Sequence, residues 1–151
     1  MLQLSRKTLY ALEAVVDIAY NARPDPVQSK EITERQGIPQ RYLEQVMQQL
    51  VRAGILRGVR GPRGGYRLAR ERRRITVADV VRVVAEADPN GDGADAGCGS
   101  ALGHQIVRPL LGELQAELTA RLEAITIEDL CQRANAIGIP AATREHADFT
   151  I

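Results

Sequence analysis

Apolar residues near the start of the chain recur at the spacing of one helix face. The first stripe lies within residues 8–22, and its members stand three or four positions apart: Leu9, Leu12, Val16 and Ala19. An α-helix has 3.6 residues per turn and brings such positions onto one side, so the pattern predicts a helix over 8–22. The segment Arg23-Pro24-Asp25-Pro26 then ends this helix, because proline cannot continue it.

Two further helices are expected to meet at a tight turn. Ser29 suits the N-cap of a short helix that ends at Gln36, where Gly37 can adopt the left-handed conformation. Pro39 suits the first turn of the next helix, and Gly54 is its expected stop. The apolar stripe of that next helix is Leu43, Val46, Met47, Leu50 and Val51. Two helices joined by a turn at Gly37 form the helix-turn-helix pattern.

A β-hairpin is predicted directly after these helices. Residues 55–60 and 66–69 have strand character, and the turn between them is Gly61-Pro62-Arg63-Gly64-Gly65. The hairpin lies in a strongly basic segment with nine arginines, at positions 52, 57, 60, 63, 67, 70, 72, 73 and 74. Such a hairpin resembles a "wing", in which glycines let the backbone approach a phosphate and arginines supply the counter-charge.

The chain is next expected to form a helix and then a long loop. Thr76 and Asp79 give a T-x-x-D start to a helix that ends near Ala87. Residues 88–103 have the composition of a loop. Loops of this length inside a compact domain are usually functional or disordered.

The longest helix is expected over residues 105–124, with Pro109 in its first turn. Its apolar stripe consists of Val107, Leu111, Leu114, Leu118 and Leu122. Such a stripe suits either a seam with a helix of another chain or packing on its own domain, and the pattern leaves both open. A last helix is expected from Thr126, again with T-x-x-D, to a stop at Gly138, and residues after Pro140 are expected to fray.

Charge separates the two halves of the chain. The net charge is only +1, but residues 1–82 hold sixteen Lys and Arg against eight Asp and Glu, a balance of +8. Residues 83–151 hold four against eleven, a balance of −7. A basic half of this size suits a polyanionic partner such as nucleic acid.

Composition excludes several classes of protein. Apolar residues make up 44% of the chain but aromatic residues only 3%, so the core must be aliphatic. No apolar run approaches the roughly 18 residues of a membrane span, and the first ten residues lack a signal-peptide core. Two cysteines are too few for a disulfide framework. We therefore expect a cytoplasmic protein with no membrane partner.

Seven short segments spread over residues 2–131 carry a resemblance to a known family. They are residues 7–12 (KTLYAL), 32–38 (ITERQGI), 42–45 (YLEQ), 52–56 (RAGIL), 59–68 (VRGPRGGYRL), 75–80 (ITVADV) and 125–130 (ITIEDL). Together they resemble the IscR, NsrR, CymR and RirA family of winged-helix transcription regulators. The most specific of them is the run from Arg60 to Tyr66, next to the YLEQ helix.

The resemblance implies a mainly α-helical fold with a small β-hairpin wing: a winged helix-turn-helix followed by a long C-terminal dimerisation helix. It implies a homodimer that binds double-stranded operator DNA, with repression as the default action. We expect a DNA-binding domain over 1–87, a sensor-type loop over 88–104, the dimerisation and final helices over 105–138, and a flexible tail over 139–151. The stripe from Val107 to Leu122 would then be the dimer seam.

Matching positions imply which residues meet DNA. Arg41, Tyr42 and Glu44 would lie at the major groove, where Glu44 can accept a hydrogen bond from cytosine. Arg60 would enter the minor groove, and Ser5 and Lys7 would lie near a phosphate. With the polar start of the recognition helix and the wing, the expected DNA-binding residues are Ser5, Lys7, Ser29, Pro39, Gln40, Arg41, Tyr42, Glu44, Gln45, Arg57, Arg60, Gly61, Arg63, Gly64, Gly65 and Tyr66.

The resemblance weakens in the loop. Sensing members of that family hold an iron–sulfur cluster there, usually with three closely spaced cysteines and one further ligand. Here the loop offers only Cys98, together with Asp92, Asp95 and His104. A cluster with these atypical ligands would be unusual and labile, because carboxylate and imidazole are harder ligands than thiolate.

Three hypotheses for the signal therefore stay open. The loop has no cluster and binds a metabolite or a partner protein; it holds an atypical cluster through Cys98, His104 and a carboxylate; or the Cys98 thiol is oxidised directly, which needs an exposed thiol of low pKa. The other cysteine, Cys131, is expected to be a small buried hydrophobe of the last helix.

Other functions fit the sequence less well. A winged-helix protein-interaction module without sequence-specific DNA binding is the alternative, and the nine arginines argue against it. An enzyme is not expected, because the chain has no P-loop and no Ser/His/Asp set. Its two histidines, His104 and His146, are far apart and lie outside any metal-binding motif.

Overall fold

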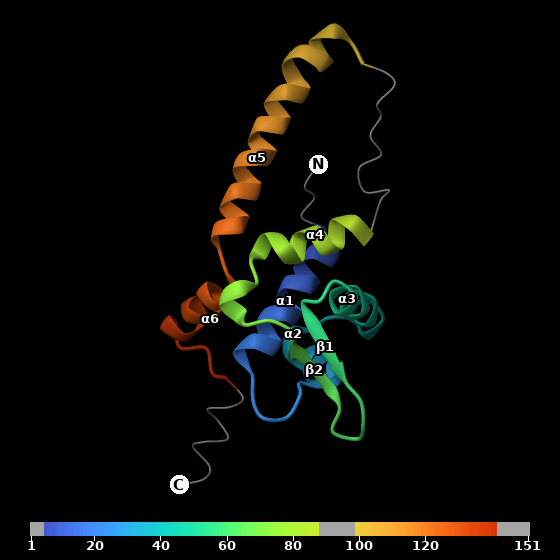
Figure 1. The fold of residues 1–151 in the computed structure, drawn as a ribbon, viewed down its shortest axis with the longest axis vertical. Helices are drawn as coiled ribbons and strands as arrows, with labels where there is room; N and C mark the ends of the chain where they lie inside the picture. The colour runs from blue at the N-terminus through green and yellow to red at the C-terminus, as the bar shows by residue number, and fades with distance from the viewer. Residues whose placement is uncertain (1–4, 88–98, 142–151) are drawn as a thin grey trace.

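A computed structural model describes residues 5–87 and 99–141 of the chain, which are mainly helical (Figure 1). The helices and strands are α1 (Arg6–Tyr20), α2 (Ser29–Gln36), α3 (Gln40–Arg52), β1 (Leu56–Val59), β2 (Gly65–Leu68), the 3-10 helix η1 (Arg72–Arg74), α4 (Val77–Ala87), the π-helical turn η2 (Gly103–Val107), α5 (Arg108–Ala124) and α6 (Ile127–Ala136). The expected fold class, mainly α with a hairpin wing, is confirmed. In these two ranges no helix has the length and apolar character needed to span a membrane.

Helix α1 lies at the centre of an aliphatic core. It packs against α2, α3, α4 and α6, and also against β2. Ile18 of α1, Ile32 of α2 and Leu43 of α3 are each at most 2% exposed. Ile127 and Cys131 of α6 are buried in the same cluster, so the last described helix completes a core that begins with the first.

The helix-turn-helix forms as predicted around Gly37, which ends α2 with a φ of 66°. The expected N-cap was wrong by one residue, because Gln28 is the N-cap and Ser29 is the first residue of α2. The reason is Glu31, whose carboxylate accepts the Gln28 backbone N–H at 2.8 Å. Pro39 likewise is the N-cap of α3 and lies just before its first turn.

The two T-x-x-D starts are confirmed, and they lie side by side. The Thr76 backbone N–H donates to the Asp79 carboxylate at 3.0 Å, and the Asp79 N–H donates back to the Thr76 hydroxyl at 3.1 Å. Thr126 and Asp129 make the same pair of bonds at 2.9 and 3.1 Å. An antiparallel bridge joins Thr76 to Thr126, so the starts of α4 and α6 are fastened to each other.

Helix α5 projects from the body as a long arm (Figure 1). Pro109 lies in its first turn as predicted, but the helical path begins earlier, at Ala101 inside the expected loop, and passes through the π-helical turn η2. Proline has no N–H and crowds the preceding turn, and a wider π turn relieves that crowding. At the base of the arm, Arg82 of α4 forms an ion pair with Glu123 of α5.

The residues after α6 pack back onto α1. Gly138 ends the helix with a φ of 80°, as predicted. The Tyr20 hydroxyl donates to the Ile139 carbonyl, and Ala141 is only 5% exposed. Residues 139–141, at the start of the expected tail, are therefore held against the core.

Val27, in the segment before α2, pairs with strand β2 of the hairpin. The Val27 N–H donates to the Tyr66 carbonyl at 3.0 Å, and the Tyr66 N–H donates to the Val27 carbonyl at 2.8 Å. Gly65 lies at the closest point, where an added Cβ would be 2.4 Å from the Val27 oxygen. The close approach of these two backbones requires glycine at position 65.

We predict that Gly65→Ala destabilises the chain by about 1–3 kcal/mol, because Val27 must move away and the bridge must stretch. The matched control is Gly58→Ala on β1, where an added Cβ meets nothing within 4 Å. Urea unfolding of both variants measures the difference. Equal stabilities would contradict the role assigned to Gly65.

Candidate nucleic-acid interface

The recognition helix α3 has one buried and one exposed face. Leu43, Val46 and Met47 are at most 1% exposed and fix the helix on the core. The expected DNA-contacting residues of the helix, Gln40, Arg41, Tyr42, Glu44 and Gln45, are all exposed. The amphipathic spacing thus presents one polar surface to solvent.

Two residues of this surface are held by neighbours. Gln40 Nε2 donates to Glu44 Oε1 at 3.2 Å, which orients the carboxylate and leaves it able to accept another hydrogen bond. The ring of Tyr42 lies 6.0 Å from the ring of Tyr10, at 37°. Tyr42 is still 45% exposed, so it packs on α1 and also faces outward.

The basic segment divides into paired and unpaired arginines. Four of the nine bind within the molecule: Arg67 donates to the Pro24 carbonyl, Arg72 pairs with Glu128, and Arg73 and Arg74 pair with Glu71. The other five have no hydrogen bond or ion pair with any residue of 5–87 or 99–141: Arg52, Arg57, Arg60, Arg63 and Arg70. All five are exposed. The wing therefore keeps the guanidinium groups that the sequence assigned to DNA free for a partner.

The wing glycines serve the turn itself. Gly61 has a φ of 116°, which side chains rarely adopt. A Cβ on Gly64 would lie 2.3 Å from the Val59 oxygen. Sequence reasoning assigned Gly61, Gly64 and Gly65 to close approach of DNA, whereas the structure gives each of them an internal reason. Tyr66 of β2 is partly buried against the core.

The three other expected contacts lie at the starts of helices. The Ser5 hydroxyl caps α1 by accepting the Thr8 N–H at 3.3 Å. Lys7 lies in the first turn of α1 and is partly exposed, and Ser29 has the same place in α2. Helix N-termini favour anions, because their N–H groups are unpaired and the helix dipole is positive there.

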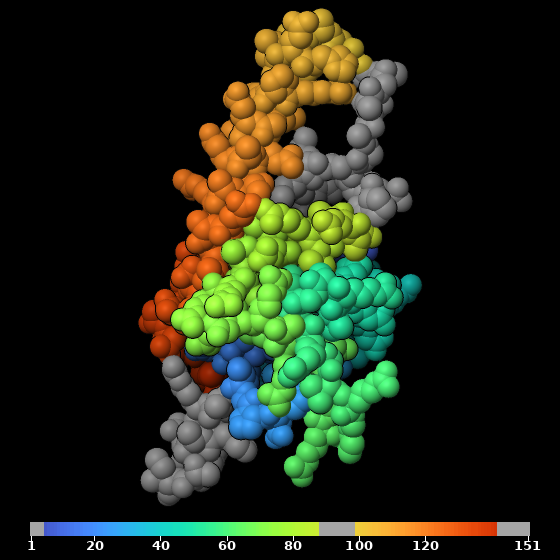
Figure 2. All heavy atoms as spheres, in the orientation of Figure 1, coloured from blue at the N-terminus to red at the C-terminus, as the bar shows by residue number. Residues whose placement is uncertain are grey.

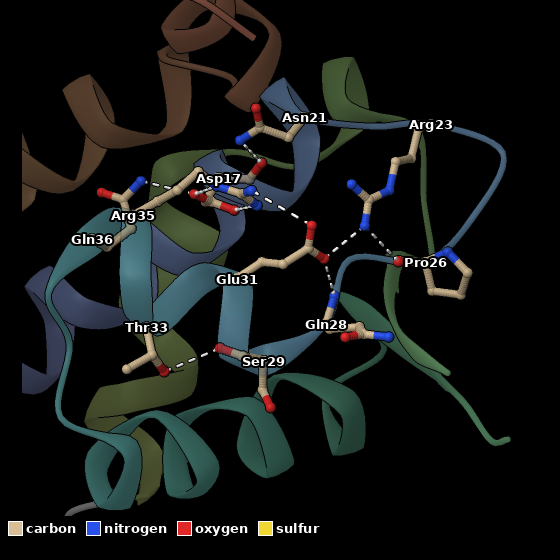
Figure 3. A network of polar contacts seen from close by, with 10 residues as sticks. All are labelled: Asp17, Asn21, Arg23, Pro26, Gln28, Ser29, Glu31, Thr33, Arg35 and Gln36. Carbon is tan, nitrogen blue, oxygen red and sulfur yellow. Dashed lines mark hydrogen bonds and ion pairs between the residues drawn. The ribbon is translucent and has the colours of Figure 1, made fainter. Parts of the chain in front are cut away.

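A buried carboxylate that sequence reasoning missed fixes the helix-turn-helix on α1 (Figure 3). The Asp17 side chain is fully buried. It accepts hydrogen bonds from Arg35 Nε at 2.9 Å, from an Arg35 terminal nitrogen at 2.7 Å, and from Gln36 Nε2 at 2.8 Å. These bonds hold the C-terminal end of α2, just before the turn into α3. The sequence places two acids next to the apolar stripe of α1, Glu13 and Asp17, and nothing in the pattern shows which of them is buried.

Glu31 connects the group formed by Asp17, Arg35 and Gln36 to the loop before α2, and we call the contacts of its carboxylate the Glu31 network. Its carboxylate lies 2.6 Å from Arg23 and 3.7 Å from Arg35, and it accepts the Gln28 N–H. Burial raises the pKa of Glu31, but the hydrogen bonds from Arg23 and Gln28 and the two positive charges outweigh it. The net effect is a pKa below the ordinary value for glutamate.

The arm presents a row of exposed apolar side chains. Of the expected seam, Val107 is 46% exposed, Leu111 38%, Leu114 51% and Leu118 36%, while Leu122 is partly buried. Ile106 and Leu110, which the predicted stripe omitted, are also exposed. No residue of α5 is buried. The arm (orange) and the wing (green) lie toward opposite ends of the molecule in Figure 2.

Of the four residues expected to hold an iron–sulfur cluster, only His104 lies within the described part of the chain. Cys98, Asp92 and Asp95 lie outside the described residues. His104 is exposed, and its ring lies against Gly99, where an added Cβ would be 2.8 Å from Nε2. Within 5–87 and 99–141 no three His, Cys, Asp or Glu residues come together as a metal site. A single thiol within residues 88–104, together with a solvent-facing imidazole on η2, does not fit a cluster held by three cysteines.

Cys131, the second cysteine, is 2% exposed in α6, as predicted for a small buried hydrophobe. Burial raises the pKa of its thiol more than the nearby Arg72 lowers it. A thiol of raised pKa is a poor nucleophile and a poor metal ligand at neutral pH.

Residues 4–133 match the family model Rrf2, described as an iron-dependent transcriptional regulator. The chain belongs to the Rrf2 family. The match spans the helix-turn-helix, the wing and the arm. It confirms the resemblance and shows that this chain is a DNA-binding transcription regulator of the winged-helix type.

Individual Rrf2 relatives agree with this assignment. The transcriptional regulator IscR of Xenorhabdus nematophila is 34% identical, with 97% of this chain and 88% of the relative covered. The solved structure of IscR from T. potens is 31% identical with a TM-score of 0.73, covering 95% of this chain and 96% of that one. The structure of CymR, the global cysteine regulator of B. subtilis, is 27% identical with a TM-score of 0.69, covering 88% and 98%.

The Glu31 network predicts a pH dependence of folding. The pKa of Glu31 is lower in the folded state than in the unfolded state, so its stabilisation is present above about pH 4.3 and is lost as the pH falls through the lowered value. We expect Glu31→Gln to cost about 0.5–1 kcal/mol at pH 7 and to flatten the loss of stability on acidification below about pH 4.3. Denaturant unfolding across that range measures both effects.

Glu34→Gln is the matched control, because Glu34 is an exposed residue of the same helix. It should leave the acid dependence unchanged. An acid dependence that is the same in Glu31→Gln as in the unmodified chain would refute the role given to the network.

Proposed function

We propose that this regulator binds operator DNA as a homodimer, with α3 in the major groove and the wing in the minor groove. The observation that carries the proposal is a set of wing arginines with no partner among the described residues, Arg57, Arg60 and Arg63. They lie close in the chain to the exposed polar face of α3. Arginines without internal partners can release counterions from phosphates, which is the main source of affinity for DNA.

Specific contacts are assigned to the start of α3. Arg41 suits the acceptor pair of guanine, and Glu44, oriented by Gln40, suits the cytosine amino group. Gln40, Tyr42 and Gln45 complete this surface, with Pro39 fixing the entry into the helix. Ser5, Lys7 and Ser29 are proposed to bind the phosphate backbone near the starts of α1 and α2.

The apolar row of α5 supports the homodimer. The projecting helix has three exposed seam residues and none buried, and Val107 of η2 continues the row, so much apolar surface is left in water at a cost of about 25 cal/mol per Å². A second copy of the same row can cover it, because a two-fold axis brings one stripe onto its equivalent. Two recognition helices related by that axis would read two half-sites.

The same reasoning supports the division of the chain. Residues 1–87 would form the DNA-binding domain, 88–104 the sensor-type loop, and 105–138 the dimerisation helix and the final helix. Repression follows if the bound dimer occludes a promoter. The proposed activity has no catalytic step, and we propose a cytoplasmic location together with it.

The signal received by the loop is proposed to be a metabolite or a partner protein, because the donors at hand do not fit a cysteine-held cluster. Iron and sulfide analysis of protein purified without oxygen tests the atypical cluster with Cys98, His104 and a carboxylate. A Cys98→Ser variant that keeps a full oxidant response in DNA binding would exclude direct thiol oxidation.

The wing arginines predict a measurable salt effect. We expect Arg60→Ala to weaken binding to an operator selected from random duplexes, and to reduce the slope of log affinity against log salt by about 1. Arg73→Ala is the matched control, because Arg73 already pairs with Glu71. Fluorescence anisotropy at several salt concentrations measures both. A salt-independent affinity in the unmodified chain would instead favour a protein-interaction module.

The proposed dimer seam on α5 can be tested by placing a charge in it. We expect Leu114→Glu to weaken the homodimer at least about tenfold, or about 1.4 kcal/mol. Ala116→Glu is the matched control, because Ala116 is exposed about 200° round the same helix. Sedimentation velocity over a concentration series measures the monomer fraction. Equal dimerisation of the two variants would overturn the proposed seam.

A further inference from the structure

A cleft of about 530 Å³ lies between α1, the end of α2 and α6, and its lining includes none of the residues proposed above to contact DNA. Its walls are mainly apolar: Leu12 and Val16 from α1, Leu130 and Ala134 from α6, and Ile139 and Pro140 from the segment after α6. A volume of this size falls within the range of sites that bind small molecules.

Several of the polar residues that line the cleft offer hydrogen-bond acceptors: Glu13, Tyr20 and Gln36. The Glu13 carboxylate has no hydrogen bond or ion pair with any residue in the described part of the chain. Gln36 turns its amide nitrogen toward Asp17 and its oxygen away from it (Figure 3). The Tyr20 oxygen donates its proton to the Ile139 carbonyl, which leaves its lone pairs to accept.

Among the described residues that line the cleft, Arg35 is the one cation, and its charge is already balanced. Arg35 donates twice to the buried Asp17 carboxylate and lies 3.7 Å from Glu31. Its charge is therefore offset on two sides, whereas the charge of Glu13 is not. An anionic ligand would meet acceptors and an unpaired carboxylate, and an ammonium group would meet complementary partners.

We propose that this cleft binds a compact apolar molecule that carries one ammonium group, and that its occupancy shifts the affinity of the chain for operator DNA. The apolar body would lie along Val16, Leu130 and Ile139, and the ammonium group would donate to Glu13 and to the carbonyl oxygen of Gln36. The regulatory half of this inference rests on the proposed function.

The position of Gln36 supplies the coupling. It is the last residue of α2, and Gly37 follows it directly as the turn into α3. Its amide also anchors that end of α2 to Asp17. A ligand bound between α6 and Gln36 stabilises one position of α2 relative to α1. Where DNA binding requires a different position of α2, the ligand lowers the affinity for DNA, and where it requires the same position, the ligand raises it.

Three probes that differ only in their polar end test the site: cyclohexylmethylamine, cyclohexylmethanol and cyclohexanecarboxylate. We expect saturable binding of the amine to the full chain, observed as chemical-shift changes of residues lining the cleft. The alcohol should bind more weakly and the carboxylate most weakly. Binding that follows apolar character alone, with no order among the three, overturns the assigned ligand class.

Two variants locate the binding. Ala134→Trp fills the cleft and should weaken amine binding about tenfold or more, or about 1.4 kcal/mol. Ala136→Trp makes the same change on the same helix outside the cleft and should have no effect. Glu13→Gln keeps the shape and should weaken amine binding about threefold, while leaving binding of the alcohol unchanged. Equal amine affinities in Ala134→Trp and Ala136→Trp overturn the site.

The regulatory half has its own measurement. Saturating amine should shift operator affinity in the unmodified chain and not in Ala134→Trp, whose operator affinity without amine serves as reference. An unchanged affinity overturns the coupling. Probe binding is measured without DNA, so a chain that binds the amine but no operator would refute the proposed function and leave the site standing.

Discussion

The packing of α1 into a shared aliphatic core is the constraint on which the rest of the molecule depends. With aromatic residues at 3%, the core is built from small and branched side chains. Ala11, Ala14 and Ala19 of α1 are fully buried, and their small size lets neighbouring helices approach closely. Because α2, α3, α4 and α6 all contact this one helix, a displacement of any of them is felt by the others.

A buried charge sets the orientation of the helix-turn-helix within that packing. An unpaired carboxylate in this core would cost several kcal/mol, and Asp17 avoids the cost through two hydrogen bonds from Arg35 and one from Gln36. Apolar contacts alone would tolerate a small rotation of α2. The planar fork of Arg35 on the carboxylate does not, so it determines how the turn at Gly37 presents α3.

The parts of the fold that were predicted from sequence depend on neighbours in the chain. The two T-x-x-D starts, the turn at Gly37 and the wing all follow from residues within a few positions of one another. The Asp17–Arg35 pair and the Arg72–Glu128 pair join distant elements, so no local pattern indicates them. The sequence counted nine equivalent arginines, whereas contacts among the described residues pair four of them: Arg67 and Arg72 with distant partners, and Arg73 and Arg74 with the neighbouring Glu71. Gln28, and not Ser29, is the N-cap of α2 because the Glu31 carboxylate accepts the backbone N–H of Gln28.

Helix α6 joins the arm to the DNA-binding surface. The starts of α4 and α6 are fastened at Thr76 and Thr126, and the base of α5 is tied to α4 through Arg82 and Glu123. From that point α6 packs against α1 and lines the cleft to which Gln36 also contributes. The proposed dimer axis and the recognition helix are therefore connected through a few packed helices with no long linker among the described elements between α5 and α1. A signal that alters how α6 packs can change the angle between the arm and α3 without unfolding either, and in a dimer such a change alters the spacing of the two recognition helices on DNA.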